Sequence, residues 1–124
     1  MQRASILVVD DDDDVRTMLC VVLSAEGYRV VGAENGLKAL ERIRNDGPPG
    51  LMFVDLMMPY MNGEDLIDAL RQDPLLAEIP VAIISGQIID GTGVQTPPVI
   101  ARLVKPVELD DLLTLAQRFA GQIA

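Results

Sequence analysis

Five residues with chemically useful side chains each follow a short apolar run: Asp10, Asp11, Asp55, Ser85 and Lys105. Three carboxylates in one site would repel one another, so that one would be protonated or a cation would be bound. The chain has no histidine, and oxygen ligands alone favour a hard cation such as Mg²⁺. An amine and a hydroxyl beside that cation would bind phosphoryl oxygens, and a carboxylate can attack phosphorus to form an acyl phosphate. This set of residues therefore indicates phosphoryl transfer onto an aspartate.

The apolar runs before these residues are typical of strands buried on both faces of a sheet. Strands are predicted over residues 6–9, 28–33, 51–54, 81–84 and 102–104. Apolar residues at helical spacing predict helices from residue 15 to a stop at Gly27, and over residues 36–45, 64–72 and 108–119. The inward face of the first helix is expected to contain Val15, Met18, Leu19, Val22 and Leu23, and that of the second helix Leu37, Leu40 and Ile43. The third helix is expected to bury Leu66, Ile67 and Leu70, and the last helix Leu109, Leu112, Leu113, Ala116 and Phe119.

Alternating strands and helices predict an α/β protein with a parallel sheet and helices on both faces. In such sheets the carboxyl ends of the strands meet at one edge, where ligands bind. The acids, the serine and the lysine are therefore expected at a common site. Asp12, Asp13 and Asp14 are instead expected to cap the first helix and to interact with its dipole.

Composition limits the class of protein. The 124 residues predict one domain over residues 1–124, and the net charge of −9 argues against direct contact with nucleic acid. A single cysteine, Cys20, excludes an internal disulfide and fits a reducing compartment. No apolar stretch reaches the roughly 18 residues of a membrane span, and the N-terminus lacks the features of a signal peptide. These observations predict a cytoplasmic protein without membrane contact.

Four motifs in order, ILVVDDD, FVDLMMPYMNG, AIISG and LVKPVE, resemble the receiver domain of two-component response regulators over residues 5–120. Within that family the chain resembles the single-domain receiver of the chemotaxis-regulator kind. The resemblance implies a flavodoxin-like (βα)5 fold with strand order 2-1-3-4-5. It also implies that Asp55 accepts a phosphoryl group from a sensor histidine kinase or a histidine phosphotransfer protein.

The same resemblance implies a role for each further site residue. Mg²⁺, or Mn²⁺ in its place, would be held by Asp11, Asp55 and the main-chain carbonyl of Met57, with Asp10 acting through bound water. Ser85 would hydrogen-bond the phosphoryl group. Lys105 would pair with that group, ahead of a cis peptide bond to Pro106.

The resemblance further implies a signalling protein that catalyses only its own phosphorylation and dephosphorylation. With no output domain in the sequence, the expected output is contact with a downstream protein or onward phosphorelay, and a homodimer is compatible with both. The chain would be either a stand-alone regulator or a receiver from a longer protein.

Two features depart from the family pattern. Arg102 stands where the family often has tyrosine or phenylalanine, three residues before Lys105. The segment over residues 86–101 is rich in glycine and proline, so a short, distorted fourth helix or a loop is expected there. Both departures affect the expected readout rather than the phosphorylation site.

Two alternatives remain open from the sequence. A phosphatase of the haloacid dehalogenase type would use Asp11 as nucleophile, with Asp13 and Val15 completing its first motif. That motif begins one residue too late after the strand, and the Asp110-Asp111 pair lies within the last predicted helix rather than after a strand. The other alternative is a pseudo-receiver, a protein-binding module that keeps the fold without phosphorylation. The intact acids and Lys105 argue against it, whereas Arg102 favours it.

Overall fold

Five parallel strands form a single sheet in the order β2-β1-β3-β4-β5, as predicted. The computed structural model describes residues 5–56, 63–86 and 98–121. The strands are β1 (Ser5–Val9), β2 (Arg29–Ala33), β3 (Leu51–Asp55), β4 (Val81–Ser85) and β5 (Val99–Val104). The three central strands β1, β3 and β4 have neighbours on both sides, and every residue of β3 and β4 is buried.

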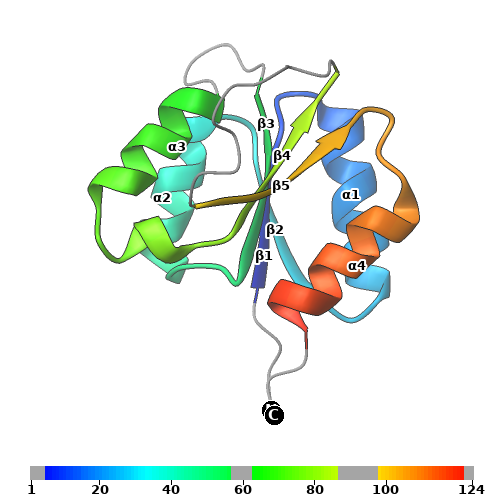
Figure 1. Cartoon of the computed structure of the whole chain (residues 1–124). Coiled ribbons are helices and arrows are strands. Elements are labelled where there is room, and N and C mark those ends of the chain that lie inside the picture. The colour runs from blue at the N-terminus through cyan, green and yellow to red at the C-terminus, as the bar shows by residue number, and fades with distance from the viewer. Residues whose placement is uncertain (1–4, 57–62, 87–97, 122–124) are drawn as a thin grey trace.

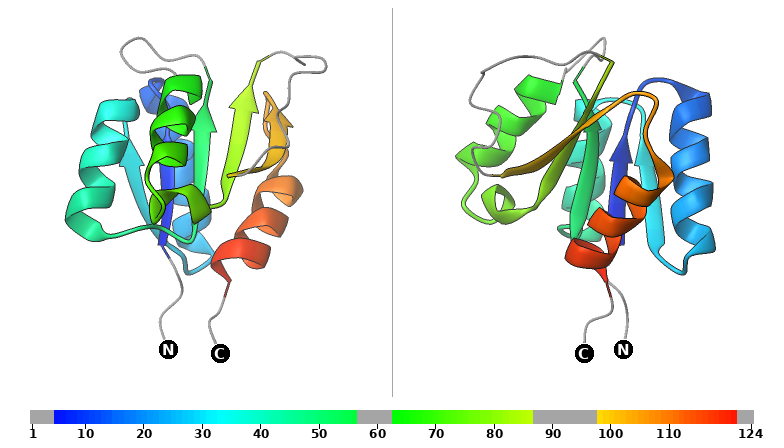
Figure 2. Two further views of the ribbon diagram at one scale, coloured as in Figure 1. Left: turned by 60° about the vertical axis from the view of Figure 1, so that its left-hand side comes forward. Right: turned by 45° about the vertical axis from the view of Figure 1, so that its right-hand side comes forward.

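Within the described part of the chain, four α-helices cover the two faces of the sheet. They are α1 (Asp13–Ala25), α2 (Gly36–Asp46), α3 (Gly63–Gln72) and α4 (Leu109–Ala120), and a short 3-10 helix, η1, spans Leu76–Glu78. Figures 1 and 2 show α2 and α3 on one face and α1 and α4 on the other. Among the described residues, no helix combines the length and the apolar character that a bilayer span requires.

The segment predicted as a distorted helix or loop lies largely outside the described residues, since residues 87–97 are not among them. At its end the prediction is wrong. Val99, Ile100 and Ala101 are extended and belong to β5, which is therefore longer than the predicted strand over residues 102–104. Two β-branched residues in this stretch suit a strand, and the neighbouring β4 provides hydrogen-bonding partners.

The core consists of two apolar layers separated by the sheet. One contains buried residues of α2 and α3 with one set of strand side chains; the other contains buried residues of α1 and α4 with the alternate set. This division follows from the period of two along each strand. The helix faces differ from prediction at three positions: Met18 of α1 is 51% exposed, Leu37 of α2 is 56% exposed and Leu109 of α4 is 52% exposed.

Asparagine and aspartate side chains begin two of the helices. Asp12 is the N-cap of α1, and its Oδ1 accepts hydrogen bonds from the N–H groups of Asp14 and Val15 at 2.9 and 3.1 Å. Asn35 caps α2 in the same way through the Lys38 N–H at 2.8 Å. These bonds satisfy main-chain donors that a helix start leaves unpaired. The predicted capping role of the Asp12–Asp14 segment is confirmed.

β5 contains one extra residue relative to β4. Val81 pairs with Val99, but Ala82 pairs with Ala101, so that Ile100 has no partner in the register. Ile100 and Ala101 both pack against the α1–α4 layer, whereas Val99 belongs to the opposite layer. This bulge changes the alternation once, and after it the register runs unbroken to Ser85 and Val104.

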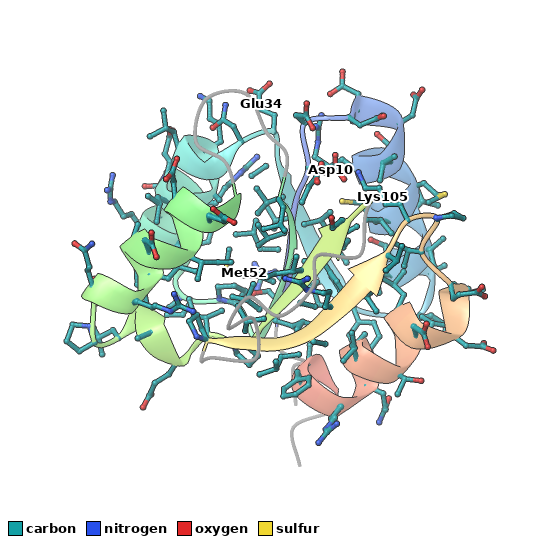
Figure 3. All side chains as sticks on the ribbon, turned by 45° about the horizontal axis from the view of Figure 1, so that its top comes forward. Asp10, Glu34, Met52 and Lys105 are labelled. Carbon is teal, nitrogen blue, oxygen red and sulfur yellow. The ribbon has the colours of Figure 1, made fainter. Side chains whose placement is uncertain are left out.

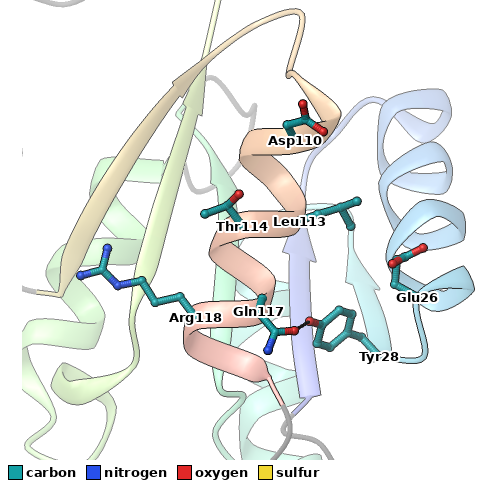
Figure 4. Close-up of a pocket in the computed structure, with 7 residues that line it drawn as sticks. All are labelled: Glu26, Tyr28, Asp110, Leu113, Thr114, Gln117 and Arg118. Carbon is teal, nitrogen blue, oxygen red and sulfur yellow. Dashed lines mark hydrogen bonds between the residues drawn. The ribbon is translucent and has the colours of Figure 1, made fainter.

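An open groove of about 750 Å³ lies between α4 and the end of α1, and the described residues that line it are mostly polar. At its base the Tyr28 hydroxyl donates a hydrogen bond to Gln117 Oε1 at 3.3 Å, which links the start of β2 to α4 (Figure 4). None of Asp10, Asp55 and Lys105 lines this groove. It is therefore separate from the edge of the sheet that those residues occupy.

Candidate functional site

The predicted site residues lie at the carboxyl ends of four adjacent strands. Asp10 directly follows β1, Asp55 ends β3, Ser85 ends β4 and Lys105 directly follows β5. The strand register brings these residues to the same height along the strands, since Val9 pairs with Val54, and Asp55 pairs with Ile84. Figure 3 shows Asp10 and Lys105 together at this edge of the sheet. The Met57 carbonyl, predicted as a metal ligand, lies outside the described residues.

Three carboxylates form a cluster at this edge. Asp10, Asp11 and Asp55 each offer an oxygen atom, and these atoms all lie within 4.8 Å of one another. Asp10 and Asp55 are buried, at 1% and 4% exposure, whereas Asp11 is exposed. An exposed carboxylate beside two buried ones allows a cation to enter from solvent and to be held by oxygen atoms alone.

Lys105 supplies a positive charge to this cluster. Its Nζ lies 3.3 Å from Asp55 Oδ2 and 3.5 Å from Asp10 Oδ2. Partial burial lowers the pKa of Lys105, but the Asp10 and Asp55 carboxylates raise it, and the net direction is upward. The ammonium is therefore charged at neutral pH. The peptide bond from Lys105 to Pro106 is cis, which confirms that part of the prediction.

Asp10 is held in place by its main chain and by one of its carboxylate oxygens. Its N–H donates to the Ala33 carbonyl at 3.1 Å, and its Oδ1 accepts from the Asp12 N–H at 2.9 Å. Asp10 Oδ2 accepts no hydrogen bond from the described residues and lies 3.5 Å from the Lys105 ammonium nitrogen. Burial raises the pKa of Asp10; the Asp12 N–H opposes this rise and Asp55 adds to it. A buried oxygen with unused acceptor capacity is what a cation or its bound water would satisfy.

Ser85 and Lys105 are joined by the end of the β4–β5 ladder. Ser85 is buried at 3% exposure, and its carbonyl accepts a hydrogen bond from the Lys105 N–H at 2.8 Å. Because Asp55 pairs with the residue before Ser85, the serine stands one step beyond Asp55 at the same edge. Ser85, Lys105 and Asp55 are thus brought to one site, as predicted from their positions after the strands.

Gly63, the first residue of α3, lies against the end of β3, and this role was not predicted. Its N–H donates to the Leu56 carbonyl at 3.0 Å. A Cβ atom at this position would lie 2.8 Å from the Asp55 carbonyl oxygen and 2.8 Å from Leu56 Cα. Both neighbours are main-chain atoms, which cannot move aside cheaply, so only glycine fits. The Asn62-Gly63 pair at the end of the motif FVDLMMPYMNG predicts a turn, but it does not predict this close approach.

Arg102, the predicted departure from the family pattern, is partly buried on β5 and pairs with Ile83 in the register. Its position places it two residues before Val104, which pairs with Ser85. Alternation along the strand puts Arg102 and Val104 on the same face of the sheet. A charged guanidinium therefore takes the place of an aromatic ring on the strand next to Ser85.

Comparison with known proteins gives a consistent result. Residues 6–117 match the family model described as "Response regulator receiver domain". A crystal structure of a response regulator receiver protein from Pseudomonas putida is 32% identical, with a TM-score of 0.87, and the alignment covers 95% of this chain and 98% of that one. The chemotaxis protein CheY4 of Vibrio cholerae is 27% identical, with a TM-score of 0.83 and coverage of 94% and 98%.

Curated relatives match over part of the chain. The DNA-binding response regulator MtrA of Mycobacterium tuberculosis is 38% identical over 85 residues, which is 68% of this chain and 36% of that protein. The sensor histidine kinase TmoS of Ectopseudomonas mendocina is 38% identical over 82 residues, which is 66% of this chain and 8% of that protein. The chain therefore matches only a minor part of these longer proteins.

Proposed function

Because the chain belongs to the response regulator receiver domain family of two-component signal transduction, we propose that Asp55 is its phosphoacceptor and that the reaction requires a divalent cation. The observation that supports this proposal most directly is the contact of Lys105 Nζ with Asp55 Oδ2 at 3.3 Å, inside a cluster of three carboxylates. Neither a helix cap nor a solvent-exposed ion pair would require a buried aspartate at this position. The phosphatase of the haloacid dehalogenase type is not favoured, since the comparisons assign the chain to receivers.

The residues of the cluster fit a hard divalent cation, Mg²⁺ or Mn²⁺. Asp11 and Asp55 would hold the ion directly, Asp10 would act through a bound water, and the Met57 carbonyl is proposed as a further ligand. This division follows the exposure of Asp11 and the unused acceptor capacity of the buried Asp10 Oδ2. When bound, the cation neutralises negative charge on the carboxylates and on the equatorial phosphoryl oxygens.

The protein's own groups perform the remaining work. A carboxylate oxygen of Asp55 attacks the donor phosphorus in line with the leaving group, so that an O–P bond forms as the P–N bond to the donor histidine breaks. The electron pair of the P–N bond leaves with the imidazole, and little acid–base catalysis is needed. The Lys105 ammonium and the Ser85 hydroxyl bind phosphoryl oxygens, which lowers the energy of the charged transition state.

Partners follow from the same chemistry. We propose that the phosphoryl donor is a sensor histidine kinase or a histidine phosphotransfer protein, and that the output is contact with a downstream protein or onward transfer. The match to part of a sensor histidine kinase and to part of a DNA-binding regulator supports a place in either kind of longer protein. We propose further that residues 1–124 form one receiver domain that modifies only itself.

Intact-mass measurement tests the proposal. Acetyl phosphate or phosphoramidate with Mg²⁺ is expected to add one phosphoryl group to the wild type and none to Asp55→Asn. Asp68→Asn, which alters an exposed aspartate of α3 that pairs with Arg71, is the matched control and is expected to react as the wild type does. EDTA should abolish the reaction. Label on Asp55→Asn within residues 10–14 would support the phosphatase-type reaction instead, and no label on any protein would support a pseudo-receiver.

A further inference from the structure

Arg16 of α1 lies against the segment that joins β1 to α1. Its Nη1 donates a hydrogen bond to the main-chain carbonyl oxygen of Asp10 at 2.7 Å, and its Nη2 pairs with the Asp13 carboxylate. The Arg16 side chain is 20% exposed, whereas that of Asp13 is 81% exposed. The contact with Asp10 is therefore the more sheltered of the two, and the one less weakened by solvent.

The acceptor of this bond belongs to the peptide group between Asp10 and Asp11. Both flanking residues contribute carboxylates to the cluster at the sheet edge. On its other side, the Asp10 N–H is bound to the Ala33 carbonyl at 3.1 Å. Arg16 thus completes the fixation of the main chain at the point from which both carboxylates project.

Gly32 of β2 provides the space that the Arg16 side chain occupies. A Cβ atom on Gly32 would lie 3.1 Å from Arg16 Cδ and 3.3 Å from Arg16 Cγ. The aliphatic part of the arginine therefore crosses directly over the main chain of β2. A larger residue at position 32 would push the stem away and with it the guanidinium.

We infer that Arg16 is a positioning residue for divalent-cation binding: it orients the Asp10–Asp11 peptide, and Gly32 keeps open the path that lets it do so. This inference rests on the proposed function, since it takes the carboxylate cluster to be a cation site. Arginine suits the role because its planar group presents N–H donors to the Asp10 carbonyl and the Asp13 carboxylate at once. A lysine in its place keeps the charge but loses the paired donors.

The positioning role and simple electrostatics predict opposite changes in cation affinity when Arg16 is replaced. Arg16 carries a positive charge beside a proposed cation site, so removing that charge would by itself strengthen cation binding. Loss of orientation of the Asp10–Asp11 peptide weakens binding instead. The direction of the change in affinity therefore separates the two effects.

Mn²⁺ binding to the full chain, followed by the electron paramagnetic resonance signal of free Mn²⁺, tests the inference. Arg16→Ala is expected to weaken binding by about 10- to 100-fold, the range for groups that orient metal ligands. Arg16→Lys should fall between it and the wild type. Arg71→Ala, at an exposed ion pair of α3, is the matched control and should bind as the wild type does. Far-UV circular dichroism establishes that each variant is folded.

Variants of Gly32 on β2 test the contact between Arg16 and this strand from the other side. Gly32→Val is expected to weaken Mn²⁺ binding although β2 supplies no carboxylate to the cluster. In the double variant Arg16→Ala/Gly32→Val the valine has no arginine stem to displace, so the two losses should not add. In metal-free protein, both single variants should speed hydrogen exchange of the Asp12 N–H, which is bonded to Asp10 Oδ1.

The outcomes distinguish this inference from the proposed function. A wild type that binds no Mn²⁺ at millimolar concentration would overturn the cation site, and unchanged Asp12 exchange in Arg16→Ala would then overturn the positioning role separately. A wild type that binds Mn²⁺ while Arg16→Ala binds equally or more tightly would overturn the inference alone. If Arg16→Ala does not fold, the same comparison with Arg16→Lys decides.

Discussion

Replacing Lys105 by methionine removes the positive charge that faces Asp10 and Asp55 while keeping a side chain of similar length. At an effective dielectric constant of about 20, unit charges separated by 3.3 Å attract by about 5 kcal/mol, and the pair at 3.5 Å is similar. Lys105 is 30% exposed, so solvent screening and the energy of desolvation offset much of this attraction. We expect Lys105→Met to lower the free energy of unfolding of the metal-free protein by about 2 kcal/mol.

Urea unfolding in EDTA at pH 7 measures this loss. With a denaturant slope of about 1.5 kcal/mol per molar urea, the transition midpoint of Lys105→Met should fall by about 1.3 M. Mg²⁺ should restore more stability to the variant than to the wild type, since the ion no longer competes with an ammonium for the same carboxylates. Lys38→Met, which removes an exposed lysine 3.9 Å from Glu41, is the matched control and should change stability by at most about 0.5 kcal/mol.

The pH dependence follows from the two shifted groups. The pKa of Lys105 is raised, so its stabilising contribution is present below its ordinary value of 10.5 and is lost as pH rises through the raised value. The contribution also needs ionised carboxylates, and the pKa of Asp10 is raised above 3.8. The difference between wild type and Lys105→Met should therefore shrink as pH falls through that raised value, because the contact with Asp10 is then lost. Equal midpoints at pH 7 in EDTA, or a difference as large at pH 3 as at pH 7, would refute the reasoning.

Three further predictions concern a glycine beside the site, a core residue and a helix cap. Gly63→Ala would place a Cβ 2.8 Å from the Asp55 carbonyl oxygen, so we expect a lower unfolding midpoint and slower phosphorylation by acetyl phosphate; unchanged kinetics would contradict the close approach. Phe53→Ala empties a fully buried position of the central strand and should cost about 3–5 kcal/mol in urea unfolding, whereas a cost below 1 kcal/mol would contradict its packing. Asn35→Ala removes the cap of α2 and should cost about 1 kcal/mol, with phosphorylation unaffected.

Much of the fold could be predicted because strand and helix signals alternate without conflict. The apolar runs predicted the existence of all five strands, and the turn residues between them predicted the order of strands and helices along the chain. The site could be predicted because parallel strands bring their carboxyl ends together whatever their order. Asp10 and Asp55 are remote in sequence from Lys105, yet their carboxylate oxygens lie 3.5 and 3.3 Å from its ammonium nitrogen.

Other features depend on three-dimensional relations that a linear pattern does not carry. Met18, Leu37 and Leu109 occupy apolar positions of helical periodicity but are about half exposed. Periodicity identifies the apolar stripe of a helix, but not which of its residues the sheet covers. The start of β5 at Val99 depends on pairing with β4 as well as on the β-branched residues Val99 and Ile100. The contact of Arg16 with the Asp10 carbonyl depends on the absence of a side chain at Gly32, sixteen positions away.

The extra residue in β5 lies before the ladder that positions Lys105. Ile100 shifts the phase of the strand before Ala101, and the ladder from Ala82–Ala101 to Ser85–Val104 then carries Lys105 to the acids. Four consecutive residue pairs of β4 and β5 lie between the bulge and the site. Because a slip of one residue in this ladder would turn each side chain of β5 to the other face of the sheet, the unbroken register is what holds Lys105 beside Asp55.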